Sequence, residues 1–218
     1  MADNSEPGAR QRGRAENTAR ILASARRQIA EHGAVGLSMR AVARDVGMVS
    51  SAVFRYFESR EALLTELIIE SYHHLADAVH DAVDRVGGGR SAADRWRAAT
   101  RAARAWALQF PHEFQLIYGT PIPGYQAPPQ TIPAAARVAG PFLEIAATGA
   151  GADDHPGGGF VQPVDVSAGA TAGAVAELTQ LIGFITMQLA GHFVGVVTAP
   201  DDYFDVIIER QVATLGLD

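Results

Sequence analysis

The sequence predicts an all-α protein in two parts: an N-terminal three-helix domain that contains a helix-turn-helix, and a larger helical domain. Two observations predict this fold class. Apolar residues recur at helical spacing along most of the 218-residue chain. Between Leu37 and Phe57, two short helical patterns are joined through Gly47, as in a helix-turn-helix.

Residues 1–14 contain glycine, proline and polar groups without apolar periodicity, and we interpret them as a mobile basic arm. Arginines in such an arm can enter a DNA minor groove, although a solvated tail explains the composition equally well. The arginines concerned are Arg10, Arg12 and Arg14.

Residues 15–64 form the predicted helix-turn-helix domain. Its first helix, residues 15–32, has an apolar face and ends near Gly33. A second helix follows, capped by Ser38 and stopped by Gly47. The face of the first helix consists of Ile21, Leu22, Ala25 and Ile29, and that of the second consists of Met39, Val42, Ala43 and Val46.

The third pattern begins at Ser50, whose side chain we expect to cap the helix in place of Val49. Its expected apolar face consists of Val53, Phe54 and Phe57. Its expected solvent face consists of Ser51, Arg55 and Tyr56. Ser59 then caps a connecting helix, residues 60–86, with Glu61 in the first turn and Arg60 exposed.

These residues form a recognisable series: Ser38-Met39-Arg40, Ala43, Gly47, Phe54-Arg55-Tyr56-Phe57 and Ser59-Arg60-Glu61-Ala62-Leu63-Leu64. The series resembles the DNA-binding domain of the tetracycline-repressor (TetR) family, over about the first third of the chain. Val49 stands where that family usually has Ser or Thr, and Phe54 stands where a tyrosine hydroxyl usually meets a phosphate. The resemblance implies a regulator that binds a double-stranded DNA operator.

The second helix of such a motif fits a major groove about 12 Å wide. By resemblance, we expect Ser38, Tyr56 and Arg60 to contact phosphates. The residues expected to face the bases are Arg40, Ser50, Ser51 and Arg55, and Ala52 completes the predicted DNA-binding set. A helical hairpin inside a core is the simpler alternative for the same pattern.

The net charge of −6 is divided unevenly along the chain. Through Leu64, ten arginines face seven acidic residues, which gives +3; afterwards eight arginines face seventeen acidic residues, which gives −9. A basic end on an acidic body concentrates attraction for phosphate where the helix-turn-helix lies.

The connecting helix carries three possible metal ligands on one face: His73, Asp77 and His80. Their spacing is acceptable for a metal site, but a solvated or satisfied polar face explains it more simply. The chain has no cysteine, so a thiolate site or a disulfide is impossible. We expect no cofactor.

Residues 65–218 form the predicted effector-binding and dimerisation domain. A helix over 91–110 is followed by Pro111 and by a loop that begins at Gly119. The pattern resembles the C-terminal domain of the WHG type found in one TetR branch, although Ile182-Gly183 replaces the signature His-Gly. The matching residues are Trp106, Leu108, Pro111, Phe114, Leu116, Tyr118, Gly119, Pro121, Pro123, Gly124 and Tyr125.

Two further segments complete the organisation. A helix over 134–147 is expected to be interrupted or kinked near Gly140-Pro141, and residues 149–165 are expected to be a loop. Residues 178–200 carry no charge, which suits either a membrane span or a buried helix.

We interpret the uncharged run as part of a homodimer interface formed by the last two helices, not as a membrane segment. Gly183, Gly191 and Gly195 would allow close approach of a second backbone. The last helix would contribute a stripe consisting of Phe204, Ile207, Ile208, Val212 and Leu215.

Ligand sites are mostly apolar with a few polar groups, and the larger domain contains many candidates. Taken singly, each is more simply a core residue, but the family resemblance implies a small-molecule effector. The predicted pocket residues are Trp106, Phe110, Phe114, Tyr118, Phe142, Gln180, Phe184 and Met187, with His112 as a further polar contact.

No catalytic motif is present: there is no Gly-x-Ser-x-Gly elbow, no His-Glu-x-x-His and no phosphate-binding glycine loop. We therefore predict a cytoplasmic, homodimeric repressor released from a palindromic operator by a small apolar or amphipathic effector. The alternative is a small-molecule-binding helical protein or enzyme whose helix-turn-helix is not its main activity.

Overall fold

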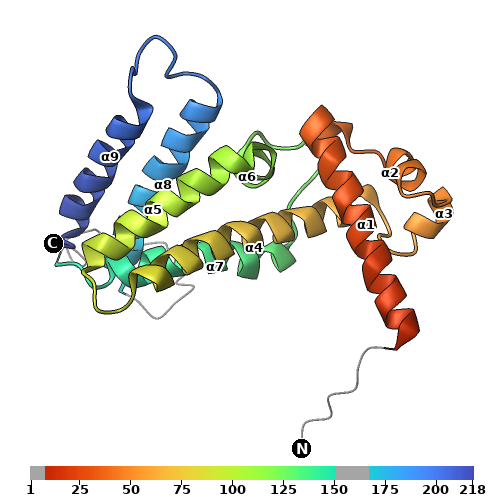
Figure 1. The fold of residues 1–218 in the computed structure, drawn as a ribbon, viewed down its shortest axis with the longest axis horizontal. Coiled ribbons are helices and arrows are strands. Elements are labelled where there is room, and N and C mark those ends of the chain that lie inside the picture. Colours follow the sequence, from red (N-terminus) through yellow and green to blue (C-terminus); the bar gives the residue numbers. More distant parts are fainter. Residues whose placement is uncertain (1–7, 151–166) are drawn as a thin grey trace, which may run out of the picture. The chain divides into compact units, whose positions relative to one another are not determined.

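A computed structural model describes residues 8–150 and 167–218 (Figure 1). Within these ranges the secondary structure consists of α-helices α1 to α9 and two short 3-10 segments, with no strand. The all-α prediction is confirmed. The chain forms two compact units, of which one contains the chain up to Ile68 together with Pro121–Pro128, and the other contains Ile69–Thr120 and the chain from Pro129.

The first helix, α1, extends over Ala9–His32 and therefore begins earlier than predicted. Arg10, Arg12 and Arg14 lie in its first turns, so the prediction that they belong to a mobile arm is wrong. These turns are exposed, and an exposed helical turn needs no apolar face. The absence of apolar periodicity in residues 1–14 therefore did not exclude a helix there. The remainder of the predicted arm, residues 1–7, lies outside the described part. The helix ends at Gly33, as predicted.

Helix α2 spans Met39–Asp45, and the Ser38 hydroxyl accepts a hydrogen bond from the Ala41 amide at 3.4 Å. Gly47 follows it with φ of +70°, a conformation that favours glycine. Both predicted boundaries of this helix are confirmed. The 3-10 segment Ala34–Gly36 connects α1 to it.

Helix α3 is short, Ser50–Val53, and differs from the prediction in two ways. Its N-cap residue is Val49, which makes no side-chain cap, and Ser50 is already helical. Phe54 was predicted to be buried but is 45% exposed, whereas Val53 and Phe57 are buried. The helix ends at Val53 and the chain turns, so helical spacing no longer determines where Phe54 points.

Helix α4 spans Arg60–Val86, as predicted, and the Ser59 hydroxyl caps it by accepting from the Ala62 amide at 3.0 Å. Its first turns belong to the N-terminal unit and the rest to the second unit. The loop Pro121–Pro128 also belongs to the N-terminal unit, where the Tyr125 and Thr65 hydroxyls are 2.9 Å apart. The division therefore differs from a simple boundary after residue 64.

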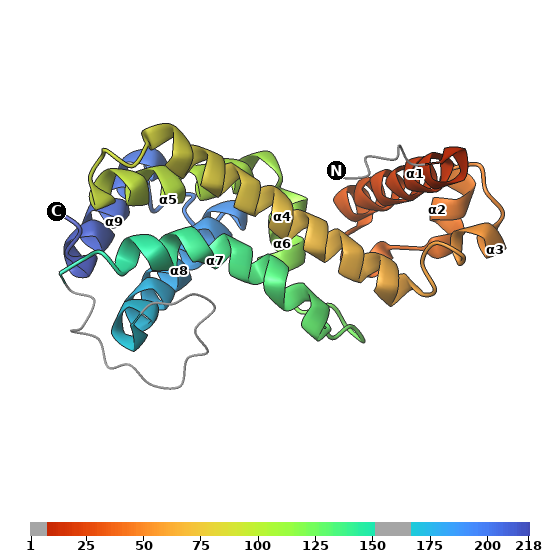
Figure 2. The ribbon, with the colours of Figure 1, turned by 90° about the horizontal axis from the view of Figure 1, so that it is seen from below.

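The second unit contains the remainder of α4 and five further helices (Figure 2). Helix α7 continues through Pro141 without the predicted interruption. Of the predicted loop 149–165, residues 151–165 lie outside the described part. The five helices are α5 (Ala92–Gln109), α6 (Pro111–Tyr118), α7 (Ile132–Ala146), α8 (Ala168–Leu189) and α9 (Pro200–Leu215); a 3-10 segment, Pro129–Thr131, precedes α7.

Three ion pairs align α5 with α9: Arg97 with Glu209, Arg101 with Asp205, and Arg104 with Asp201. Increasing numbers on α5 pair with decreasing numbers on α9, so the two helices are antiparallel. The helix α5 also packs against α7 and α8 and thus lies at the centre of this unit.

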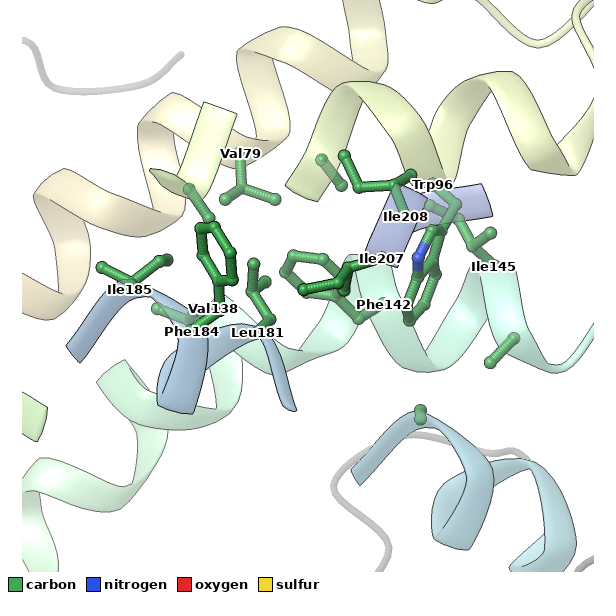
Figure 3. Close-up of a cluster of buried hydrophobic side chains, with 14 of the residues drawn as sticks. Val79, Trp96, Val138, Phe142, Ile145, Leu181, Phe184, Ile185, Ile207 and Ile208 are labelled. Atoms are coloured by element: carbon green, nitrogen blue, oxygen red, sulfur yellow. The ribbon is translucent and has the colours of Figure 1, made fainter. Parts of the chain in front are cut away.

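The core of the second unit is apolar and aromatic (Figure 3). Trp96 of α5 meets Phe142 of α7 edge to face, with ring centroids 5.4 Å apart. Phe184 and Ile185 of α8 and Ile207 and Ile208 of α9 are buried in the same cluster. The stripe predicted on the last helix exists, but it packs inside its own chain and is not available to a partner.

By length and composition alone, α8 could cross a membrane, since its most apolar window has a hydropathy of 1.3. Of that window, 44% is buried inside the protein. Burial in a core accounts for an apolar helix equally well. Gly191 and Gly195 do not lie in α8 but in the turns that follow it, with φ of +77° and +80°.

Candidate DNA-binding surface

The N-terminal unit holds its helices on a small apolar core. Helix α1 packs against α2, and α2 packs against α3. Ile21 of α1, Val42 of α2 and Val53 of α3 are each 0% exposed. Because this core fixes α3 from one side, the opposite side of α3 is free to meet another molecule.

Most of the predicted DNA-contacting residues lie on α3 and on the turn after it. Ser51 and Arg55 are exposed, and Ser50 and Ala52 are half-buried beside them. Arg40 is exposed on the first turn of α2, but the Ser38 hydroxyl serves as a helix cap. The exposed Phe54 adds an apolar side chain that the sequence pattern had assigned to the core.

Arg60 is not exposed as predicted but is held within the domain. Its Nε donates to the Leu37 carbonyl at 2.9 Å, and its Nη2 donates to the Ala34 carbonyl at 2.8 Å. A weaker contact joins Nη2 to the Val35 carbonyl at 3.2 Å. The guanidinium therefore ties the start of α4 to the segment that joins α1 to α2, and it is poorly placed for the predicted phosphate contact.

Tyr56 follows α3 and is contacted from α1 by Arg14, which was considered only as part of a mobile arm, and by Asn17, which was not predicted to have a role. The Asn17 amide donates to the phenol oxygen at 3.1 Å, and the Arg14 guanidinium lies over the ring, 5.3 Å from its centroid. Apolar periodicity identifies only the buried face of α1, so the contacts of Arg14 and Asn17 with Tyr56 could not be predicted from it.

The N-terminal unit also carries an ion pair between Arg27 of α1 and Asp45 of α2. This pair lies on exposed side chains and reinforces the contact between α1 and α2.

The predicted aromatic effector residues lie in or against the one apolar core of the second unit, where they form several smaller ring contacts. Trp106 and Phe110 pack with His74, Phe114 packs with Tyr118, and Phe142 packs with Trp96. Phe184 belongs to a further group with Phe193 and Phe204. Met187 and Gln180 are exposed, and Gln180 accepts a hydrogen bond from Gln211 at 3.1 Å.

Two polar groups stand out among these aromatics. The Trp106 Nε1–H is buried and has no hydrogen-bond partner in the described part of the chain. Burial raises the pKa of Tyr118, and the neighbouring Tyr72 contributes to the same shift. His74, which packs on Trp106, lies 3.2 Å from a Glu113 carboxylate oxygen.

Two of the three side chains considered for a metal site have other contacts. Asp77 pairs with Arg137 at 2.6 Å, and the His80 ring lies 3.1 Å from the Arg137 carbonyl. Across residues 8–150 and 167–218, no group of three His, Cys, Asp or Glu side chains is arranged to hold a metal ion.

Comparison with known proteins identifies the family. Residues 21–67 match the family model described as bacterial regulatory proteins of the tetR family. Residues 96–211 match the tetracyclin repressor-like C-terminal domain. The chain belongs to the tetR family. The predicted family and the prediction of a regulator in place of an enzyme are confirmed by this assignment.

The relatives agree with the family. The HTH-type transcriptional regulator Rv1816 of Mycobacterium tuberculosis is 44% identical over 159 residues, which cover 71% of this chain and 66% of the relative. The crystal structure of SCO4313, described as a regulatory protein, is 31% identical, with a TM-score of 0.80 over 95% of this chain and 100% of that one. A protein of unknown function from Rhodococcus sp. RHA1 shares the fold at 23% identity and a TM-score of 0.73, over 99% of this chain and 100% of that one.

Proposed function

We propose that this tetR-family protein is a sequence-specific repressor that binds DNA through α3. The observation that carries the proposal is the two-sided environment of α3. Val53 is 0% exposed on one side, while Ser51 and Arg55 are exposed on the other. Small and basic side chains on a fixed helix can reach base edges in a major groove. A DNA target inside a bacterial cell implies a cytoplasmic protein.

We assign individual roles from exposure and donor chemistry. Arg40, Ser50, Ser51 and Arg55 are proposed to contact base edges, with Ala52 packed beside them. Tyr56 is proposed to contact a phosphate. The Ser38 hydroxyl accepts from the Ala41 amide, so it is proposed to contact a phosphate only by donating its O–H. Arg60 is proposed to act indirectly, because its guanidinium supports the domain.

The protein is proposed to act as a homodimer through the outer faces of α8 and α9. Glu177 is the only charged residue in the 22 residues of α8. At helical spacing the helix exposes the uncharged residues Ala176, Thr179, Gly183 and Met187, and the exposed Ala190 follows at its C-cap. On α9, Tyr203 and Val206 are 46% and 53% exposed. An uncharged exposed face of this kind supports burial against a second copy.

Gly183 offers a clean test of this interface. A side-chain carbon added at Gly183 would meet no heavy atom within 4 Å in the single chain. A Gly183→Arg variant should therefore fold normally but sediment as a monomer if this face forms the dimer. A dimer of unchanged stability would move the interface elsewhere.

A small effector is proposed to bind among the aromatic residues of α4, α5 and α6. The buried, unpartnered Trp106 Nε1–H supports this, since a buried donor without an acceptor is costly. A ligand with an acceptor atom would satisfy it. An effector that fits the DNA-free conformation better than the bound one would shift the population, typically by 1 to 3 kcal/mol.

Fluorescence anisotropy tests the repressor proposal directly. The purified protein is titrated against labelled DNA from upstream of its own gene, with a scrambled duplex as competitor and with several salt concentrations. Binding that resists the scrambled competitor is expected. The operator should be a palindrome whose two half-sites lie about 34–36 Å apart. Equal, weak binding to duplexes that tile the neighbouring genes and to the scrambled duplex would overturn the proposal.

A further inference from the structure

A chain of hydrogen bonds within the N-terminal unit ends at Tyr56. The Arg20 Nη2 donates to the Val46 carbonyl at 2.7 Å, and its Nη1 donates to the Asn17 Oδ1 at 3.3 Å. The Asn17 Nδ2 in turn donates to the Tyr56 phenol oxygen at 3.1 Å. Because Arg20 occupies the amide oxygen of Asn17, the amide nitrogen is the group that faces Tyr56.

This polarity determines what Tyr56 can offer to a ligand. A phenol carries one donor proton and lone pairs that accept. Asn17 uses the accepting side, so the phenol O–H remains free to donate, and no described residue receives it. Tyr56 is half-buried, so the residue keeps part of its surface exposed to solvent. A fixed donor at the surface is suited to an anionic oxygen.

Arg14 supplies positive charge at the same place. Its guanidinium lies over the Tyr56 ring, with Cζ 5.3 Å from the centroid, and its Nη2 makes a long hydrogen bond of 3.5 Å to the Arg55 carbonyl. The side chain remains exposed and has no carboxylate partner in the described part of the chain. A guanidinium has five donors, so most of them are free to bind an anion.

We propose that Arg14, Asn17 and Tyr56 form a composite site for a phosphodiester group of double-stranded DNA. Tyr56 and Arg14 touch the phosphate, and Asn17 is a positioning residue that keeps the phenol proton directed outward. The site lies beside Arg55, so it would fix the orientation of the recognition segment on the duplex. The ligand assignment rests on the proposed DNA-binding function.

The test uses the full-length protein and three variants: Arg14→Gln, Tyr56→Phe and Asn17→Ala. Binding to the upstream duplex and to the scrambled duplex is measured at several salt concentrations. The variant Arg90→Gln, which removes an exposed arginine from the acidic body, is the control for net charge. Thermal unfolding of every variant reports whether the domain remains folded.

A phosphate contact makes specific predictions. Arg14→Gln should weaken binding to both duplexes by about tenfold and reduce the salt slope by about 0.9, while Arg90→Gln should change neither. Tyr56→Phe should weaken both complexes with little change in slope. The variant Asn17→Ala should have the same effect as Tyr56→Phe, and the double variant should be no worse than either, because both remove the same directed proton.

Other results would overturn the site. An unchanged salt slope for Arg14→Gln means that its guanidinium supports Tyr56 without touching phosphate. Additive losses for Asn17→Ala and Tyr56→Phe mean that the amide does not position the phenol. Because a phosphate contact does not depend on base sequence, the same comparisons can be made on the scrambled duplex. If the wild type fails to discriminate between sequences, the repressor proposal fails, and the phosphate site is still judged separately.

Discussion

The Trp96 indole nitrogen donates to the Gln211 Oε1 at 3.0 Å inside the second unit. This bond joins α5 to α9, and the Gln211 amide continues to the Glu177 carbonyl and to the Gln180 side chain of α8. Trp106, two to three turns further along α5, is equally buried but has no such partner. Of the two buried indole N–H groups, that of Trp96 is hydrogen-bonded and, among the described residues, that of Trp106 is not.

This contrast predicts unequal costs for the same substitution. Trp96→Phe leaves the Gln211 Oε1 without its donor, whereas Trp106→Phe removes an indole N–H that has no partner in the described part of the chain. Both variants lose packing, but Trp96→Phe should be more destabilising by about 1–3 kcal/mol. Urea unfolding followed by circular dichroism measures the difference. Equal losses would indicate that Trp106 has a partner, such as a buried water.

Arg60 is predicted to matter for stability more than for direct DNA contact. Arg60→Gln removes the donors to the Leu37 and Ala34 carbonyls and should destabilise the N-terminal unit by about 1–3 kcal/mol. Arg40→Gln removes an exposed arginine of the same unit and is the control. Thermal unfolding should distinguish them. A normal melting temperature with weakened DNA binding would restore the phosphate-contact role of Arg60.

Arg55 is predicted to contribute to sequence discrimination. Its side chain is exposed, and its hydrogen bonds within the domain are made by its backbone: the N–H donates to the Ala52 carbonyl and the carbonyl accepts from Arg14. Arg55→Ala should therefore leave the melting temperature unchanged. Loss of a base contact worth about 1–3 kcal/mol should lower the preference for the operator over a scrambled duplex.

Arg44→Ala, which removes an exposed arginine near the end of α2, serves as the matched control for Arg55. Competition anisotropy compares the two variants on both duplexes. If Arg55→Ala weakens the operator and the scrambled duplex equally, its role is limited to phosphate attraction.

The sequence was sufficient wherever a local rule determines the structure. Ser38, Gly47 and Ser59 act on the backbone next to them, so the boundaries of α2 and the start of α4 were predictable. The exposure of Phe54 was not predictable, because α3 ends at Val53 and helical spacing no longer determines where the next side chain points.

The candidate site was predictable only in part, for a related reason. The exposure of Ser51 follows from helical spacing within α3, whereas Arg55 lies in the turn after the helix, where that spacing no longer applies. Arg14 and Asn17 lie about forty residues earlier and reach Tyr56 only through the packing of α1. Six of the eight pocket candidates lie in or against the apolar core, whereas Gln180 and Met187 are exposed, and one sequence contains no signal that separates core from cavity.

The ion pair between Arg97 and Glu209 predicts how stability depends on acid. Arg97 donates to both carboxylate oxygens, at 2.8 and 2.7 Å, and this hydrogen bonding lowers the pKa of Glu209 below its ordinary value of 4.5. A lowered folded-state pKa contributes stability that is present above about pH 4.5 and is lost as the pH falls through the folded value. The free energy of unfolding should therefore decrease on acidification.

Part of this decrease should disappear in Glu209→Gln, which cannot be protonated. The variant should be less stable than the wild type near neutral pH, and the two should converge below about pH 4.5, because the wild-type pair is then broken as well. Urea unfolding at a series of pH values measures the convergence, and Glu144→Gln, an exposed glutamate outside the pair, is the control. Parallel curves for wild type and Glu209→Gln would show that the pair carries no proton-linked stability, since only a shifted pKa can make the difference between them depend on pH.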